Sequence, residues 1–552
     1  MDRHAKSKDT FRESRKGVCS VSDTLSPVSG LDSWAVRIHA VLEKWERVVV
    51  TLSILAVIGL AAGYARYRPL WLDEYYTYYT AVQPSAGAIW NMQSSGPLVL
   101  DPPLYHLLAH YSMRLLGSSS FGLRFPSVLA YGVACLCIYL LVRKRAGPLT
   151  GLIAIGLTIP TIVLRYAHEG RPYIFMVTAC AGALLAWSYM AEKTSGRRLA
   201  ALGLFLSMAV AVSSHWYGCL VAVPVLCGEA VRTVMRRKLD WGVLVACGGG
   251  TAVALLYLPL VKAATAYQSK SWKSVRLLDV RDSYKFLLDA NPLMLALSFL
   301  VLASAAVYLI AGETKLTELE RPRRIPLHES VALLACGLLP FFGYILARAV
   351  VHQFVPRYVI ASVVAFVVLI AFELRRASKG AIAILAVAFG ATLVSFGASA
   401  IDLVQLIRGG DERTQFARST AVLSRDTSLP IVVDEQNMFF RLSAKAPGEI
   451  RARTVHLTDS SADAILQQES TTSAALAIRR WTKLPVKDYA PFIAEHRQFL
   501  LISDIQGYFE WVGQKVQAEG ATLRLEGLLA EHPVFLVTMP ERQAEDVLLI
   551  RR

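Results

Sequence analysis

The sequence has few charged residues, and it has no cysteine beyond Cys336. Only 18% of its 552 residues are charged and 54% are hydrophobic, whereas about 25% of a soluble domain is charged. This composition excludes a disordered chain, a collagen-like fibre and a single soluble core. The eight cysteines form no CxxC pair, so neither a disulfide framework in the C-terminal region nor a cysteine metal site is predicted.

Long apolar segments are abundant. A stretch of about 20 apolar residues crosses a bilayer core about 30 Å thick. Such segments lie at 47–65, 121–142, 148–166, 173–191, 199–215, 218–231, 241–260, 292–311, 328–349, 355–372 and 380–401. The sequence therefore predicts a mainly α-helical, polytopic membrane protein with about 11 transmembrane helices.

The net charge of +16 belongs to the membrane portion, because residues 402–552 contain 18 Lys/Arg against 20 Asp/Glu. Basic clusters fall on alternate short loops, at 143–145, 193–198, 232–238, 321–324 and 375–379. Lys and Arg are retained on the cytoplasmic side, so the N-terminus is predicted to be cytoplasmic and the C-terminus outside. Nucleic acid is not a predicted partner, since no stripe of aromatic residues accompanies the basic ones.

The chain divides into three predicted parts. Residues 1–46 form a basic cytoplasmic tail, predicted to be disordered. Residues 47–401 form the membrane domain, with an outer loop at 66–120 and a basic outer loop at 262–290. Six cations in the second loop lie on the side that should lack them, which indicates either an anionic ligand or a solvated loop that neighbouring charges tolerate.

Residues 402–552 have a different character. Strand-like runs at 430–434, 454–457, 499–503, 521–528 and 533–539 alternate with helical patterns at 461–480, 487–496 and 506–519. This alternation predicts an α/β domain, on the extracytoplasmic side. It contains no GxGxxG, P-loop or nucleophile elbow, which indicates an accessory role.

Three acidic residues stand out in the first outer loop. Asp73 and Glu74 follow the first span directly, and Asp101 precedes Pro102 and Pro103. Carboxylates at the end of a membrane span are costly and are functional candidates, although an acidic pair at a helix start also caps the helix. Two short interfacial helices are predicted here, with the acids near their starts.

Two further outer junctions contain arginine. The first is Arg165 to Tyr173, which includes Arg171, and the second is His352 to Tyr358, which includes Arg357. Arginine binds phosphate through two parallel hydrogen bonds. The alternative is that these side chains only extend from helix ends towards water.

Together these segments resemble the GT-C superfamily of integral-membrane glycosyltransferases. The likeness is to its family 39-like branch, which includes protein O-mannosyltransferases and the aminoarabinose transferases of lipid A. It covers residues 47–400 and rests on five segments in order: Asp73-Glu74, Asp101-Pro-Pro-Leu-Tyr105, Leu123-Arg-Phe-Pro-Ser-Val128, Glu169-Gly-Arg-Pro-Tyr173 and Pro356-Arg-Tyr358. Asp101 stands where many relatives have His, and His168 replaces an amide.

The resemblance implies transfer of a sugar from a polyprenyl-phosphate donor to an acceptor hydroxyl at the outer face, with inversion. It implies Asp73 as general base, Glu74 as orienting group and Asp101 as a supporting acid. The donor phosphate would meet Arg171, Arg357, Lys270, Lys273 and Arg281, with the basic loop as a lid. The remaining pocket candidates are Tyr105, His106, His168, Glu169, Tyr173 and Tyr358. No cofactor is required by the sequence; a divalent cation would fit among these acids and histidines, but no spacing demands one.

The expected partners are the polyprenyl-phosphate sugar, membrane lipids and a lipid, glycan or protein acceptor. The resemblance implies a bacterial cytoplasmic membrane, although composition alone also allows an endoplasmic-reticulum membrane. Two alternatives stay open: a transporter or flippase of a lipid-linked sugar, and a non-catalytic membrane receptor whose outer domain binds glycan or protein.

Overall fold

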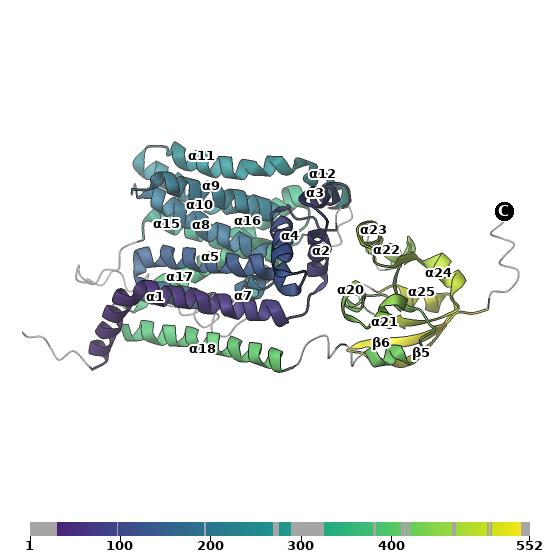
Figure 1. The fold of residues 1–552 in the computed structure, drawn as a ribbon. Helices are drawn as coiled ribbons and strands as arrows, with labels where there is room; N and C mark the ends of the chain where they lie inside the picture. Colours follow the sequence, from purple (N-terminus) through teal and green to yellow (C-terminus); the bar gives the residue numbers. More distant parts are fainter. Residues whose placement is uncertain are drawn as a thin grey trace, which may run out of the picture.

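The computed structural model describes residues 30–541, except 97, 193–194, 269–274, 289–324, 379–381, 410–415, 417–419, 466–470, 505–506 and 508–509. Most of this chain is helical, and a small sheet domain follows the helices (Figure 1). The helices of the membrane portion are α1 (Gly30–Tyr67), α2 (Leu72–Ala81), α3 (Ala86–Ser94), α4 (Leu104–Leu116), α5 (Ser120–Ala146), α6 (Pro148–Leu157), α7 (Ile162–Ala167), α8 (Tyr173–Ala191), α9 (Arg197–Ser214), η1 (Trp216–Val221), α10 (Ala222–Arg236), α11 (Trp241–Ala252), η2 (Val253–Tyr257), α12 (Leu258–Gln268), α13 (Leu278–Leu287), α15 (Leu327–Gly337), α16 (Leu339–Leu346), η4 (Ala347–Val351), η5 (Pro356–Ser362), α17 (Val363–Ala377) and α18 (Ile382–Arg408).

The described residues include 8 helices long and apolar enough to span a membrane, or up to 9 if the pair Leu327–Gly337 and Leu339–Val350, bent by 55°, is one span. The predicted span 148–166 is instead divided into α6 and α7, because Pro160 follows α6 and cannot continue its hydrogen bonding. The predicted span 292–311 lies outside the described residues. The protein is a multi-pass membrane protein, and the number 11 stays a prediction.

Helix α5 lies in the interior of the bundle and packs against α1, α6 and α8, while α9 covers the other side of α8. The core between these helices is apolar and includes the buried side chains of Tyr131, Cys180 and Trp187. Leucines on the bundle surface remain exposed, for example Leu129 at 47% and Leu202 at 51%. Such an apolar exterior is what a lipid-facing surface requires.

Ion pairs join the charged helix ends at one end of the bundle. Arg145 at the end of α5 contacts Glu192 after α8 at 2.6 Å and Glu329 in α15 at 2.5 Å. Arg232 of α10 contacts Asp240 before α11 at 3.0 Å. Loops that the sequence predicts on a single side are therefore neighbours in the structure.

Helices α2, α3 and α4 lie at the other end of the bundle, beside the start of α5 (Figure 1). The sequence predicts two helices here, and both exist; α3 is additional. Helix α4 buries Tyr105 and His106 and exposes Leu108, Tyr111 and Leu115. The exposed apolar side is the one expected of a helix at a membrane surface.

The C-terminal residues form a six-stranded sheet in the order β3-β2-β1-β4-β6-β5, with helices α20–α25. The strands β3, β2, β1 and β4 are parallel, and β6 and β5 are antiparallel additions. The bounds are β1 (Ile431–Val433), α20 (Gln436–Lys445), α21 (Gly448–Arg453), β2 (Thr454–Thr458), α22 (Ser461–Ile465), α23 (Thr471–Trp481), β3 (Val486–Asp488), α24 (Tyr489–Glu495), β4 (Gln498–Ile502), α25 (Val512–Ala518), β5 (Thr522–Leu529) and β6 (His532–Thr538).

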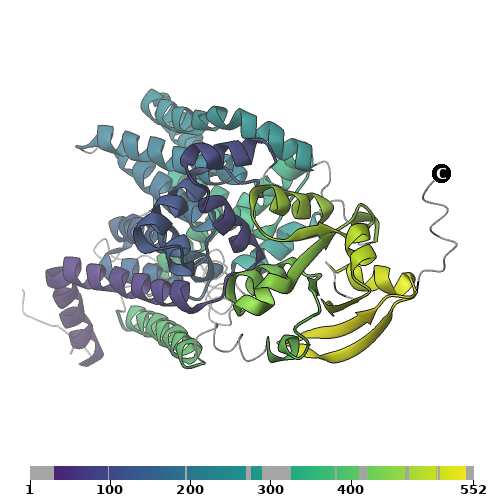
Figure 2. The same cartoon turned by 45° about the vertical axis from the view of Figure 1, so that its right-hand side comes forward.

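The α/β fold predicted for this domain is confirmed, and all five predicted strands are present. The prediction missed β3, a three-residue strand whose start precedes a predicted helix, and the helices α20 and α21. Two views of the molecule place the sheet domain beside the end of the bundle that carries α2, α3 and α4 (Figures 1 and 2).

Candidate active site

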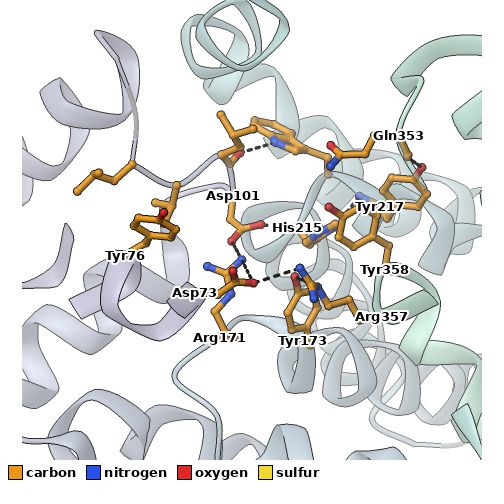
Figure 3. Close-up of a pocket in the computed structure, with 14 residues that line it drawn as sticks. Asp73, Tyr76, Asp101, Arg171, Tyr173, His215, Tyr217, Gln353, Arg357 and Tyr358 are labelled. Atoms are coloured by element: carbon orange, nitrogen blue, oxygen red, sulfur yellow. Dashed lines mark hydrogen bonds and ion pairs between the residues drawn. The ribbon is translucent and has the colours of Figure 1, made fainter. Parts of the chain in front are cut away.

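A pocket lies at the end of the bundle that carries α2 and the segment before α4, and Figure 3 shows the residues that line it. Its walls come from α2, from the segment 98–101, from the turn before α8, from η1 and from η5. The lining residues are Asp73, Tyr76, Leu98, Val99, Leu100, Asp101, Arg171, Tyr173, His215, Trp216, Tyr217, Gln353, Arg357 and Tyr358. Five separate chain segments therefore converge on one cavity.

Asp73 is in the first turn of α2 and extends into this pocket. Its Oδ2 lies 3.1 Å from Arg357 Nη2 and 3.9 Å from Arg171 Nη2. The side chain of Asp73 is 20% exposed. A carboxylate that is held by cations yet still reachable from the cavity has the geometry required of a base that accepts a proton from a bound hydroxyl.

Asp101 lies deeper and is more strongly held. Its Oδ2 is 2.8 Å from Arg171 Nη2, and its Oδ1 is 3.7 Å from His215 Nε2. Burial has the largest single effect and would raise the pKa of Asp101, but the charge of Arg171 together with smaller contributions from neighbouring groups outweighs it, and the pKa is lowered. Burial lowers the pKa of His215 to about 4. His215 is therefore neutral near pH 7, and Asp101 is the fixed anion that orients Arg171.

The two arginines are also positioned by neutral groups. Arg357 Nε donates to Tyr173 Oη at 2.9 Å, and its guanidinium lies 5.7 Å from the centre of the Trp71 ring. Arg171 Nη1 donates to Thr77 Oγ1 at 3.2 Å. Because the pocket contains two acids and two arginines, an anionic ligand that binds the arginines must compete with Asp73 for them.

Glu74, the neighbour of Asp73, is not part of the pocket. Its carboxylate accepts hydrogen bonds from Arg124 at 2.6 and 2.5 Å, from Gly170 N at 2.5 Å and from Trp71 N at 3.3 Å. The side chain is 0% exposed. The capping role that the sequence left open is therefore observed. The role of Glu74 in orienting the acceptor or a partner stays a prediction; its contacts here are with Arg124 and with backbone amides.

Of the other pocket candidates, Tyr173 and Tyr358 line the cavity, whereas four are buried behind it: Tyr105, His106, His168 and Glu169. Tyr105 Oη donates to Leu123 O at 3.0 Å, and His168 stacks on Tyr64. Burial lowers the pKa of His106 to about 4. Burial, together with the nearby Glu74, raises the pKa of Glu169 to about 7. These four side chains support the walls rather than contact the cavity.

The basic outer loop contributes none of the described lining residues. Arg281 is on α13, has a side chain that is 60% exposed, and pairs with Asp282 at 3.0 Å. Lys270 and Lys273 lie outside the described residues. Among the residues that the structure describes, no group of three or more His, Cys, Asp or Glu side chains could hold a metal ion.

Several lining residues were not predicted as site residues: Tyr76, His215, Trp216, Tyr217 and Gln353. Trp216 Nε1 donates to Leu100 O at 2.6 Å, and Tyr217 Oη donates to Gln353 O at 2.5 Å. A signal for three of them exists in the sequence, since His215, Trp216 and Tyr217 interrupt two apolar runs. An aromatic and basic break between spans is typical of a functional membrane segment.

The fold and the pocket define a multi-pass membrane protein with a charged cavity at one end of its helical bundle and an appended sheet domain. Residues 101–272 match the dolichyl-phosphate-mannose-protein mannosyltransferase family. No curated protein sequence matches the chain.

Several solved structures are similar to most of this chain. The crystal structure of ArnT from Cupriavidus metallidurans bound to undecaprenyl phosphate is 12% identical, with a TM-score of 0.53, and the match covers 89% of this chain and 98% of that one. Its apo state gives the same score and identity, with 90% and 98% covered. The oligosaccharyltransferase AglB from Archaeoglobus fulgidus, in complex with an inhibitory peptide and a dolichol-phosphate, has a lower TM-score of 0.46 at 12% identity, over 84% and 70%.

The predicted resemblance to the GT-C superfamily is thus confirmed: the chain has the ArnT-like fold, and a stretch that includes Asp101 and Arg171 matches a mannosyltransferase family. Family match and fold together support a membrane glycosyltransferase.

Proposed function

We propose that the protein transfers a sugar from a polyprenyl-phosphate donor to an acceptor hydroxyl, with inversion at the anomeric carbon and with Asp73 as the general base. The observation that carries this proposal is the position of Asp73 between Arg171 and Arg357 in a cavity at one end of the bundle. The supporting likeness is to ArnT, which has been crystallised with undecaprenyl phosphate.

In this reaction the acceptor oxygen forms a bond to the anomeric carbon while the bond from that carbon to the phosphate oxygen breaks. The hydroxyl proton moves to Asp73, and the electron pair of the broken bond stays on the phosphate, which leaves as polyprenyl phosphate. Arg171 and Arg357 neutralise the charge that develops there. As the phosphate binds the arginines, Asp73 loses part of its pairing with Arg357 and becomes a stronger base than it is in the empty pocket.

We assign the role of fixed counter-ion to Asp101, because it holds Arg171 at 2.8 Å and is nearly buried. Glu74 instead fixes the start of α2 through Arg124. A divalent cation is not needed for this scheme, since both pocket acids face arginine. The acceptor class is a lipid, glycan or protein hydroxyl.

For the membrane, we propose a bacterial cytoplasmic membrane with the N-terminus inside and the pocket and sheet domain outside. The ion pairs that join basic helix ends at the end of the bundle opposite α2–α4 support this orientation, because arginine and lysine accumulate on the cytoplasmic side.

The test is donor turnover by the purified protein in detergent, with a panel of polyprenyl-phosphate sugars and a short-chain alcohol or glycolipid acceptor. We expect one donor to be consumed, with release of polyprenyl phosphate and a product of inverted anomeric configuration by proton NMR. Retained configuration would contradict the single-displacement scheme. Absence of turnover with every donor, together with net movement of the lipid-linked sugar across proteoliposomes, would favour the transporter instead.

A further inference from the structure

The sheet domain contacts the two pocket walls that come from α2 and from the segment before α4. Helix α20 of the domain packs on α2, which carries Asp73 and Tyr76. The ring of Phe440 stacks on Tyr75 at 5.3 Å and lies 5.6 Å from Tyr76, between ring centres. Phe440 is 0% exposed and Tyr75 is 2% exposed. The contact is therefore a packed core rather than a surface touch.

A hydrogen bond fixes the same contact. Tyr76 Oη donates to Gln436 Oε1 at the start of α20. Tyr76 is a lining residue of the pocket and lies one helical turn from Asp73. Gln436 is therefore bonded to a side chain of the cavity wall, and it lies at the helix start that Glu435 caps.

Trp481, the last residue of α23, contacts the chain two positions before the second wall. Its Nε1 donates to Gly96 O at 2.7 Å, and its own carbonyl accepts from Gln83 Nε2 at 3.3 Å. Gly96 has a φ of 131°, and a Cβ there would lie 3.3 Å from Arg480 Nη1, so the close approach of the domain favours glycine. From Gly96 the chain continues to the lining residues 98–101, where Gln93 and Trp216 hold the carbonyls of Asp101 and Leu100.

The two arginines of the pocket, in contrast, come from segments of the bundle: Arg171 from the turn before α8 and Arg357 from η5. The sheet domain thus contacts the side of the cavity that holds the proposed base, and the bundle supplies the side that would hold the donor phosphate.

We infer that the sheet domain is a positioning module for the acceptor side of the pocket, and that Gln436 and Trp481 are its positioning residues, acting through Tyr76 and through Gly96, which lies two positions before the lining residues 98–101. This inference rests on the proposed function and assigns a role to residues 431–538 within it. Loss of either contact should impair acceptor use and the chemical step while donor binding stays intact.

The experiment uses full-length protein with three variants and one control. Gln436→Ala removes the oxygen that accepts the hydrogen bond from Tyr76, and Gln436→Glu keeps such an oxygen. Trp481→Phe removes the indole N–H that donates to Gly96 but keeps an aromatic ring. Gln517→Ala is the matched control, because Gln517 is an exposed glutamine on α25 of the same domain. We measure kcat and KM for the acceptor, the Kd of undecaprenyl phosphate, and hydrogen exchange of the amides of α2.

For Gln436→Ala and Trp481→Phe we expect kcat/KM for the acceptor to fall about 2- to 10-fold, the effect of one hydrogen bond. We expect the Kd of undecaprenyl phosphate to stay within about twofold and the α2 amides to exchange faster. Gln436→Glu and Gln517→Ala should behave like the wild type. If the domain only stabilised the fold, both variants would lose donor binding and acceptor use in parallel, and that result would overturn the inference. Unchanged hydrogen exchange and unchanged kinetics in both variants would overturn it as well. A wild type without turnover would refute the proposed function, and the α2 exchange would still decide the positioning.

Discussion

The buried pair of Glu74 and Arg124 gives the sharpest prediction about stability. Glu74 is 0% exposed and Arg124 is 2% exposed, and they share two hydrogen bonds. Arg124 also donates to the carbonyls of Ala65, Arg68 and Pro69, so it fastens the end of α1 to the start of α2. Glu74→Gln keeps the shape but leaves a buried guanidinium without its counter-charge.

Removal of one partner of a buried ion pair costs about 3–5 kcal/mol. We expect Glu74→Gln to lower the free energy of unfolding by about this amount, measured by SDS titration in mixed micelles with circular dichroism. The additional change Arg124→Gln should recover part of the loss, because it removes the uncompensated charge.

A matched control exists at the other end of α5, the helix that carries Arg124. Glu46 of α1 pairs with Arg143 of α5 at 2.9 Å, and there the side chains are 20% and 47% exposed. Glu46→Gln should cost at most about 1 kcal/mol, since exposed ion pairs contribute little. If Glu74→Gln unfolds like the wild type but loses all turnover, the structural role assigned to Glu74 is wrong and a direct catalytic role is indicated.

Three further predictions concern donor binding, pH and metal. Arg357→Gln should weaken binding of undecaprenyl phosphate about 10- to 100-fold, because a charged hydrogen bond is lost, while Arg281→Gln, at an exposed pair on α13, should leave the Kd unchanged; equal effects would argue against the arginine assignment. In the sheet domain, burial and the nearby Asp434 raise the pKa of Glu510 to about 7. The native state binds the proton of the Glu510 carboxyl more tightly than the unfolded chain does. Protonated Glu510 therefore contributes fully to the free energy of unfolding below a pH of about 4, and this contribution is lost as pH rises through about 7. Thermal unfolding of Glu510→Gln should therefore show a smaller loss of stability between pH 5 and 8 than the wild type, and parallel curves would refute this. Turnover should persist after treatment with a chelator, since Asp73 and Asp101 both face arginine; activity that is lost and then restored by Mg²⁺ would contradict this scheme.

The sequence predicted the four acids and arginines of the pocket because these residues are in local motifs. Asp73, Arg171 and Arg357 lie near the ends of apolar segments, where a charge is costly and indicates function, and Asp101 precedes the Pro102-Pro103 pair that begins a helix. The structure brings these four together. The spacing of apolar residues in α4 and the alternation of strand and helix patterns in the sheet domain could likewise be predicted from the sequence.

What the sequence could not provide was the choice between neighbours and the contacts between distant segments. Asp73 and Glu74 are adjacent, and only the position of Arg124, 50 residues later, decides that Glu74 is the buried one. The bond from Tyr76 to Gln436 joins residues 360 positions apart. Tertiary packing decides such contacts, and no periodicity or spacing in one sequence reports them.

The central claim is that Asp73 removes the acceptor proton, and the most direct measurement is donor turnover by Asp73→Asn beside the wild type. Asn nearly keeps the volume of Asp but cannot accept the proton, so we expect kcat to fall about 100-fold or more, with the Kd of undecaprenyl phosphate retained. Asp282→Asn, at an exposed carboxylate on α13, is the matched control and should keep full activity. Turnover by Asp73→Asn equal to that of the wild type would contradict the account and remove Asp73 from the role of base.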